Sequence, residues 1–243
     1  MEQKTLLVLG ASSEVGRKLI EAVYEDYGLI YAHYGHNDEK LKELNDGIGG
    51  RLYLIQDDFN SSDAGKAVIE TIDKNGIWPE HVVHLPSAKV TNVRFTKVKY
   101  EEVEQYLNVS LRSAITISQA VFKRLVKEER EGKEICVLSS CVNGIPPKFM
   151  LPYVTSKYAM LGYVRALSAE YADKGIMVNA VSPGMMETEF LTNIFDHAIE
   201  DNAAKSPFGR NLYVDEVIPT IKFLLSDGAD RITGQNIVVS GGM

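Results

Sequence analysis

The stretch "TLLVLGASSEVG", residues 5 to 16, decides the fold. Its first half is a short apolar run typical of a buried strand, and Gly10 then begins a turn that opens a helix at about "VGRKLIEAVYEDY". Gly10 serves the tight turn, and Gly16 allows the helix to pack closely on the strand. Backbone N–H groups and the positive end of a helix can approach a pyrophosphate in such a turn, but the usual dinucleotide spacing G-x-G-x-x-G is absent, so the stretch alone is a weak signal for a dinucleotide site.

The same alternation of short apolar runs and longer helical stretches continues along the chain. Runs rich in Val, Ile and Leu are apolar on both faces, as strands of a helix-covered parallel sheet should be. They predict seven strands, at residues 5–10, 29–34, 51–55, 81–85, 134–140, 176–183 and 236–242. Repeated strand–helix alternation predicts an α/β fold, with a Rossmann-like doubly wound parallel sheet and helices on both faces. No linker or repeat interrupts the pattern, so we predict one domain over 1–243.

The composition limits the classes of function. A chain of 243 residues that is 45% hydrophobic can bury a large core. Its net charge of −7 and the lack of a basic block argue against a nucleic-acid partner. No apolar run approaches the roughly 20 residues of a membrane span, and the N-terminus does not have the pattern of a signal peptide. These bounds predict a soluble cytoplasmic protein without a nucleic-acid or membrane partner.

The two cysteines, Cys136 and Cys141, are expected to be free thiols, although a strained loop bridge between them is conceivable. Cys141 has no histidine beside it in the sequence, which favours a plain loop thiol over a nucleophile. His84 lies on a predicted strand and is expected to be packed rather than reactive. No His, Cys and Asp cluster has metal-ligand spacing, so no metal is predicted.

A candidate catalytic pair lies in "LPYVTSKYAM", residues 151 to 160. Pro152 suits the first turn of a helix, and Tyr153 and Lys157, four residues apart, share one face of it. Upstream, the predicted strand "EICVLSS" delivers Ser139 and Ser140 to the edge of the sheet where ligands bind. A lysine ammonium beside a phenol favours phenolate, so we expect Lys157 to lower the pKa of Tyr153. The family that this pattern resembles uses such a serine, here Ser140, to stabilise a carbonyl oxygen that accepts hydride.

Taken together, these motifs resemble the short-chain dehydrogenase/reductase family over almost the whole chain. Gly10 to Gly16 resembles its T-G-x-x-x-G-x-G turn, Ser140 precedes Tyr153 by the family's 13 residues, and "ITGQNIVVSGGM" resembles its closing strand. The resemblance implies catalytic roles for Asn108, Ser140, Tyr153 and Lys157, with Asn108 holding a water that feeds protons towards Lys157. It implies cofactor contacts for Gly10, Ser12, Ser13, Val15, Gly16, Asp58, Ala88, Tyr153, Lys157, Pro183, Gly184 and Thr188. For Asp58, a simple turn or cap role is an open alternative.

The chain departs from the family pattern at three places. Leu9 and Glu14 stand where the family has Thr and its middle glycine, and Lys89 replaces a glycine after the fourth strand. Glu14 would repel a phosphate unless it turns outward in the first helical turn, where the macrodipole favours an acid. Lys89 either adds a cation near the phosphates or points outward. The second strand ends without an acid for a ribose 2′-hydroxyl, which tilts the expected cofactor to NADP, with NAD possible.

The resemblance implies an NADP(H)-dependent ketone reductase, most like the 3-oxoacyl-(acyl-carrier-protein) reductases of fatty acid biosynthesis. The substrate would be a small carbonyl compound or an acyl thioester. A dehydrogenase of another secondary alcohol, such as a sugar or steroid, and a cofactor-sensing member without turnover are the alternatives. The irregular segment 184–212 is expected to form the substrate loop, with a packed surface excursion as the other interpretation. Members of the family usually assemble as tetramers, so we expect a homotetramer or homodimer through helices at about 100–128 and 153–173 and the last strand.

Overall fold

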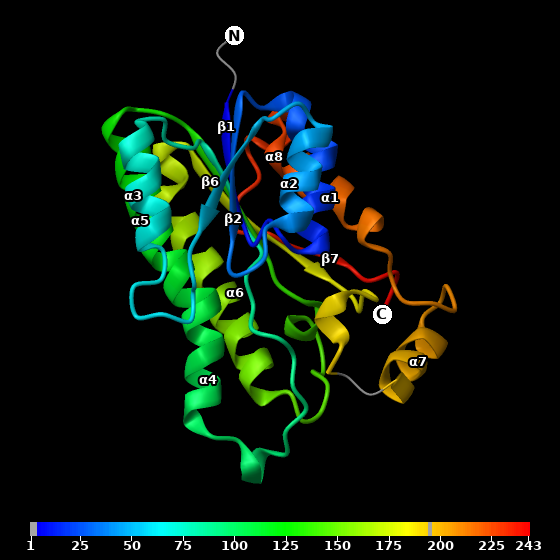
Figure 1. Ribbon diagram of the computed structural model, residues 1–243. Coiled ribbons are helices and arrows are strands. Elements are labelled where there is room, and N and C mark those ends of the chain that lie inside the picture. Colours follow the sequence, from blue (N-terminus) through cyan, green and yellow to red (C-terminus); the bar gives the residue numbers. More distant parts are fainter. Residues whose placement is uncertain (1–3, 194–195) are drawn as a thin grey trace.

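The computed structural model describes residues 4–193 and 196–243, and it is built around one parallel sheet (Figure 1). The seven strands are ordered β3-β2-β1-β4-β5-β6-β7 in space. Every pairing between neighbours is parallel. The strands are β1 Thr5–Leu9, β2 Leu29–Tyr34, β3 Leu52–Gln56, β4 His81–His84, β5 Gly132–Val137, β6 Ile176–Pro183 and β7 Asn236–Val239. The predicted doubly wound sheet is therefore confirmed.

Helices cover both faces of this sheet. Their bounds are α1 Glu14–Val23, α2 Glu39–Gly47, α3 Lys66–Asn75, α4 Tyr100–Leu107, α5 Ser113–Lys127, α6 Leu151–Tyr171, α7 Asp196–Lys205 and α8 Ile218–Leu225. Along β1 the side chains alternate between two buried cores. Leu7 and Leu9 join one core with residues of α3, α5 and α6, whereas Leu6 and Val8 join the other with residues of α1, α2 and α8. Burial of both faces explains why the strands read as continuous apolar runs.

The two glycines of the first turn act as the sequence predicts. Gly10 has a φ of +76°, a left-handed conformation that a side chain disfavours. A Cβ at Gly16 would lie 2.7 Å from the Ala11 backbone, so α1 can approach the end of β1 only through a glycine. Among the described residues, no helix is long and apolar enough to cross a membrane.

Two sequence expectations about buried side chains are met. Cys136 and Cys141 are both free and buried. His84 is buried, and its Nε2 lies 3.1 Å from the hydroxyl oxygen of Ser113, so it is packed as expected. No group of three or more His, Cys, Asp and Glu within the described ranges is arranged to hold a metal ion.

Glu134 in the middle of β5 is a buried carboxyl group that no sequence motif indicated. It is 0% exposed, and its Oε1 accepts a hydrogen bond from the Tyr163 hydroxyl at 2.9 Å. Its Oε2 has no hydrogen-bond partner among the described residues. Burial raises the pKa of Glu134 from 4.5 to about 7, because the charged form loses its hydration. The folded chain therefore binds a proton here that the unfolded chain releases at a lower pH.

This shift makes stability depend on pH. An acid whose pKa is raised in the fold lowers stability as the pH rises from about 4.5 to about 7. The cost above that window is on the order of 3 kcal/mol. We expect Glu134→Gln to unfold at higher denaturant than the wild type at pH 8 and at a similar concentration at pH 5, measured by urea titration. The matched control is Glu131→Gln at the exposed start of the same segment, and an unchanged pH dependence in Glu134→Gln would contradict the assignment.

Candidate active site

The carboxyl ends of β1, β4, β5 and β6 bring the predicted site residues to one edge of the sheet. All strands are parallel, so every strand ends at this edge. The strand order reverses between β1 and β4, where the crossover helices leave to opposite faces and the loops diverge. Ligands of open α/β sheets bind at this switch point. The first turn follows β1 here, and Ser139 and Ser140 follow β5.

The first turn is held by hydrogen bonds of Ser13. Its hydroxyl donates to the Gly10 carbonyl at 2.8 Å and accepts from the Gly16 N–H at 3.1 Å, which makes it the N-cap of α1. Glu14 is the first residue of α1 and is partly exposed, as the first-turn interpretation requires. The turn thus contains the five predicted contacts Gly10, Ser12, Ser13, Val15 and Gly16, and their roles toward a cofactor stay predictions.

Tyr153 and Lys157 lie on the first two turns of α6, with Pro152 at the start of that helix. Both side chains are buried, with exposed fractions of 9% for Tyr153 and 4% for Lys157. Lys157 Nζ donates to the Val137 carbonyl at the end of β5 at 3.1 Å and lies 5.6 Å from the centre of the Tyr153 ring. The helix and the strand end therefore place the two groups in one pocket, as the four-residue spacing predicts.

The protonation of this pair differs from the sequence expectation. Burial raises the pKa of Tyr153 above its usual value of 10.0, and a hydrogen bond with Ser139 opposes the shift. Burial also lowers the pKa of Lys157 to about 8. The expected lowering of the Tyr153 pKa is not found in this structure, because the loss of hydration on burial is the largest effect and outweighs the opposing effect of Ser139. Tyr153 consequently stays protonated at neutral pH, as a proton donor must be.

The two serines after β5 occupy different surroundings. The Ser139 hydroxyl accepts from the Cys141 N–H at 3.3 Å, and Ser139 opposes the effect of burial on the pKa of Tyr153. Ser140 begins a 3-10 turn, Ser140–Val142, and lines a small pocket formed also by Gly184 and Ser240. The catalytic role of Ser140 stays a prediction.

Asn108 begins a π-helical turn, Asn108–Arg112, that joins α4 to α5. Such turns are frequent at functional sites. Two residues further on, the Ser110 hydroxyl donates to the Pro86 carbonyl at 3.2 Å and holds the loop after β4 that contains Ala88. Lys89 in this loop is exposed, which matches the outward alternative. The water-holding role of Asn108 and the cofactor contact of Ala88 remain predictions.

Two aromatic residues that the sequence motifs did not indicate enclose Tyr153. The Tyr106 ring meets Tyr153 edge-on at 6.4 Å, and its hydroxyl donates to the Lys89 carbonyl. Phe190 lies on the other side, with ring centres 6.2 Å apart. Tyr106 thereby links the loop after β4 to the candidate proton donor. Its position two residues before Asn108 in the same helix was the only signal of this role in the sequence.

The remaining predicted cofactor contacts lie on loops at the same edge. Asp58 is exposed, and its Oδ1 accepts from the Asn60 N–H at 2.9 Å, so the turn role is present and the adenine contact stays a prediction. Pro183 ends β6, and the Gly184 N–H donates to Val239 at 2.8 Å. Thr188 precedes a short 3-10 turn, Glu189–Leu191. The structure thus brings these residues to the edge without assigning a ligand to them.

The two ends of the segment 184–212 lie close together, and between them the segment crosses the ligand-binding edge of the sheet. Met186 pairs with Leu212, which closes the excursion. Between them, Glu189 forms an ion pair of 2.6 Å with Lys40 of α2, and Phe190 packs on Tyr153. Because α2 follows β2 on the other side of the switch point, the segment spans the groove between these elements. Residues 194 and 195 of the predicted substrate loop lie outside the described residues.

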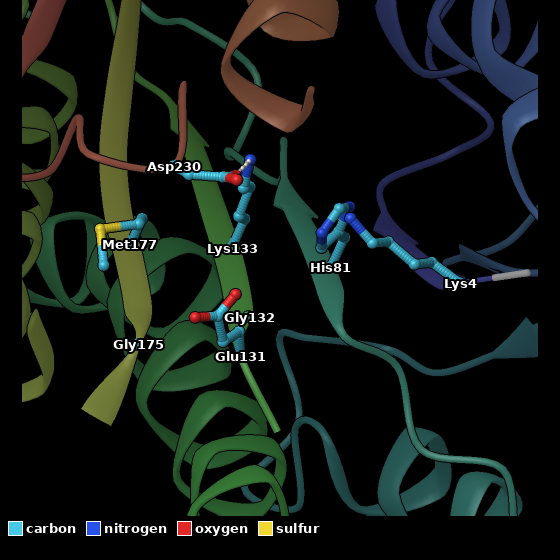
Figure 2. Close-up of a pocket in the computed structure, with 8 residues that line it drawn as sticks. All are labelled: Lys4, His81, Glu131, Gly132, Lys133, Gly175, Met177 and Asp230. Atoms are coloured by element: carbon cyan, nitrogen blue, oxygen red, sulfur yellow. Dashed lines mark ion pairs between the residues drawn. The ribbon is translucent and has the colours of Figure 1, made fainter. Parts of the chain in front are cut away.

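A second pocket lies at the opposite edge of the sheet (Figure 2). Its lining includes Lys4 before β1, His81 at the start of β4 and Gly132 at the start of β5. The ion pair drawn there joins Lys133 Nζ to Asp230 at 2.6 Å. All of these strand starts are remote from Tyr153, so this pocket is separate from the candidate active site.

The serine assignment can be tested directly. We expect Ser140→Ala to lower kcat about 100-fold, because the predicted hydrogen-bond donor to the developing oxyanion is lost. Ser139→Ala should lower kcat no more than a few-fold. Steady-state kinetics of the two variants at saturating cofactor measure the difference, and the reverse order would assign the oxyanion donor to Ser139.

Comparisons with known proteins agree with this arrangement. Residues 10–243 match the family model described as enoyl-(acyl carrier protein) reductase. The acetoacetyl-CoA reductase of Acinetobacter sp. (strain RA3849) is 27% identical over 249 residues, covering 100% of this chain and 98% of that protein. The 3-oxoacyl-(acyl-carrier-protein) reductase FabG of Staphylococcus aureus (strain Mu50 / ATCC 700699) is 28% identical over 245 residues, covering 99% of this chain and 98% of that protein.

Solved structures show the same fold. A 3-oxoacyl-(acyl-carrier protein) reductase from Brucella melitensis, solved with bound NAD, superposes with a TM-score of 0.86 at 22% identity. The match covers 100% of this chain and 91% of the other. At this identity the likeness supports the architecture of the sheet and helices, and nothing finer.

Proposed function

The chain belongs to the short-chain dehydrogenase/reductase family, and on this premise we propose that it reduces a ketone to a secondary alcohol with NADPH. The observation that carries the proposal is the buried Tyr153–Lys157 pair, held at the carboxyl end of β5 beside the switch point of the sheet. A non-catalytic module has no need of a buried phenol and ammonium at this edge, because both lose hydration there. The reaction is a reversible hydride transfer.

During this transfer, side chains of the protein would donate a proton and stabilise the charges that develop. A bound nicotinamide supplies the hydride and leaves negative charge on the substrate oxygen. Tyr153, protonated at neutral pH, donates its hydroxyl proton to that oxygen. Lys157, whose pKa is about 8, carries a positive charge that stabilises the phenolate left behind. Ser139 or Ser140 donates a hydrogen bond to the same oxygen, and Asn108 holds a water toward Lys157.

The proposed substrate is a 3-oxoacyl thioester. The names of the acetoacetyl-CoA and 3-oxoacyl-(acyl-carrier-protein) reductases among the relatives support this class. The apolar rings of Tyr106 and Phe190 beside Tyr153 suit the carbon chain of an acyl group. The alternative is another secondary alcohol, such as a sugar or steroid, oxidised with NAD. Turnover of NADPH with a short 3-oxoacyl thioester and a panel of ketones separates the two, and tight cofactor binding without turnover would favour a sensor.

A group of cations supports NADP as the cofactor. Lys40 pairs with Glu189 at 2.6 Å, and Arg17 and Lys89 also contribute to lowering the pKa of that carboxyl. Arg17 and Lys40 lie on α1 and α2, the helices that follow β1 and β2. β2 ends at Tyr34 and is followed by Gly35, so no acidic residue lies at the end of this strand. A 2′-phosphate would find positive charge here, and no carboxylate of β2 would repel it.

We further propose that the protein acts in the cytoplasm in fatty acid biosynthesis and assembles as a homotetramer or homodimer. Apolar side chains on α5 and α6 support an interface between copies, because Ile115 and Tyr158 are both exposed. Size-exclusion chromatography with light scattering measures the assembly.

Replacement of the candidate proton donor provides the first test of the proposal. We expect Tyr153→Phe to reduce kcat by about 10²–10⁴-fold, because the donor proton is lost while the ring and its packing remain. Binding of NADPH, measured by calorimetric titration, should change less than about threefold. Tyr53→Phe, at an exposed tyrosine of β3, is the matched control and should retain full activity. Retained turnover in Tyr153→Phe would discard the mechanism.

The cofactor preference is tested at the ion pair. We expect Lys40→Ala to weaken NADPH binding several-fold and leave NADH binding nearly unchanged, since only NADPH carries the 2′-phosphate. Glu189→Gln should tighten NADPH binding, because the carboxylate no longer competes for Lys40. Titrations at low and moderate salt measure both effects, with Lys42→Ala on the same helix as control. Equal losses for NADPH and NADH would contradict NADP as the preferred cofactor.

A further inference from the structure

His33 in β2 is a buried histidine that links two parts of the ligand edge. It is 3% exposed, and its ring stacks on Phe59 with centres 4.0 Å apart and planes 6° from parallel. Its Nδ1 lies 3.0 Å from the Gly10 nitrogen, and its Nε2 lies 2.9 Å from the Asp57 carbonyl oxygen. One imidazole therefore joins the turn after β1 to the chain that leaves β3.

The two hydrogen bonds fix the state of the ring. A backbone N–H can only donate and a carbonyl can only accept, so Nδ1 accepts from Gly10 and Nε2–H donates to Asp57. The imidazole is thus neutral and held as a single tautomer. Burial lowers the pKa of His33 to about 4, which agrees with a neutral ring at neutral pH.

Each end of this link continues into a predicted part of the cofactor site. On one side, the Gly10 carbonyl accepts from the Ser13 hydroxyl and backbone N–H, and the same hydroxyl accepts from the Gly16 N–H. On the other side, the Asp57 carboxylate accepts from the N–H groups of Gly65, Ala67 and Val68 and anchors the start of α3. Asp58, the predicted adenine contact, follows at once.

We propose that His33 is a positioning residue for the dinucleotide, which sets the distance between the phosphate turn at Gly10 and the adenine end at Asp57 and Asp58. The inference rests on the proposed function for the identity of the ligand. His33 is covered by Phe59 and by its own strand, so it acts through Gly10 and Asp57 and does not touch the cofactor. Its loss would alter how the cofactor is bound and leave the chemistry at Tyr153 unchanged.

Substitutions that remove one or both hydrogen bonds test this role. His33→Phe keeps a flat ring on Phe59 and removes both hydrogen bonds. His33→Asn places its Oδ1 near the position of Nδ1, so it can still accept from the Gly10 N–H. We expect His33→Phe to raise the Kd of NADPH about tenfold or more, because a buried N–H is left without an acceptor. His33→Asn should recover most of this loss.

Kinetics separate positioning from a merely structural role. In His33→Phe the KM for NADPH should rise with its Kd, whereas kcat at saturating NADPH and the KM for the ketone should stay within about twofold. The matched control is His81→Phe, which removes a buried ring that contacts Tyr27 at the opposite edge of the sheet. That variant should lower the unfolding midpoint without changing the Kd of NADPH.

The outcomes distinguish this inference from the proposed function. If the wild type binds NADPH but turns over no ketone, the proposed function fails, and the Kd values still decide the role of His33. A His33→Phe variant that binds NADPH as the wild type does overturns the inference, as does equal weakening in His33→Asn and His33→Phe. If His33→Phe does not fold, the NADPH affinities of His33→Asn and His81→Phe are compared instead. Near-wild-type NADPH binding in His33→Asn, which keeps the hydrogen bond from the Gly10 N–H, supports the inference.

Discussion

The pairing of β1 with both β2 and β4 is the constraint on which the rest of the structure depends. Because all three strands are parallel and the chain reaches β4 only after building β2 and β3, the connections on the two sides of β1 must leave to opposite faces. The loops therefore separate at one edge of the sheet. Gly10, with its left-handed backbone, turns the chain into α1 at this point, and His33 fastens the turn from the neighbouring strand.

Burial has a second consequence at this edge, because it shifts the pKa of three titratable groups. The same loss of hydration raises the pKa of Tyr153, lowers that of Lys157 and lowers that of His33. A phenol that holds its proton is the state that the proposed proton transfer from Tyr153 requires.

Much of the fold could be predicted because apolar periodicity records burial directly. β2 and β6 lie where the sequence places them, yet β5 ends at Val137 and not at Ser140. The apolar run includes Leu138, which stays buried and donates its N–H to the Val181 carbonyl at 2.8 Å just after β5 ends. The terminal strand is likewise shorter than its motif, because Gly241 and Gly242 adopt left-handed conformations that an extended strand does not use.

The site was predictable where its residues are close in sequence. Tyr153 and Lys157 lie one helical turn apart, so their spacing alone places them on one face of α6. The choice between Ser139 and Ser140 depends on how the chain leaves β5, which a residue count does not contain. His33 and Gly10 are 23 residues apart, and only the register of β1 on β2 brings them together. The direction of the Tyr153 pKa shift could not be predicted from the sequence either, because a motif shows a neighbouring charge but not the loss of hydration on burial.

The segment after β6 contacts both α2 and the candidate proton donor Tyr153. Glu189 meets Lys40 near the predicted adenosine end of the groove, and the next residue, Phe190, meets Tyr153 at the reacting end. Since the two contacts are adjacent in the chain, a shift of one backbone segment moves both. A molecule that extends from the Gly10 turn to Tyr153 would therefore meet this segment. The exposed ion pair alone contributes little to stability, so the segment depends chiefly on its other contacts, among them the packing of Phe190 on Tyr153.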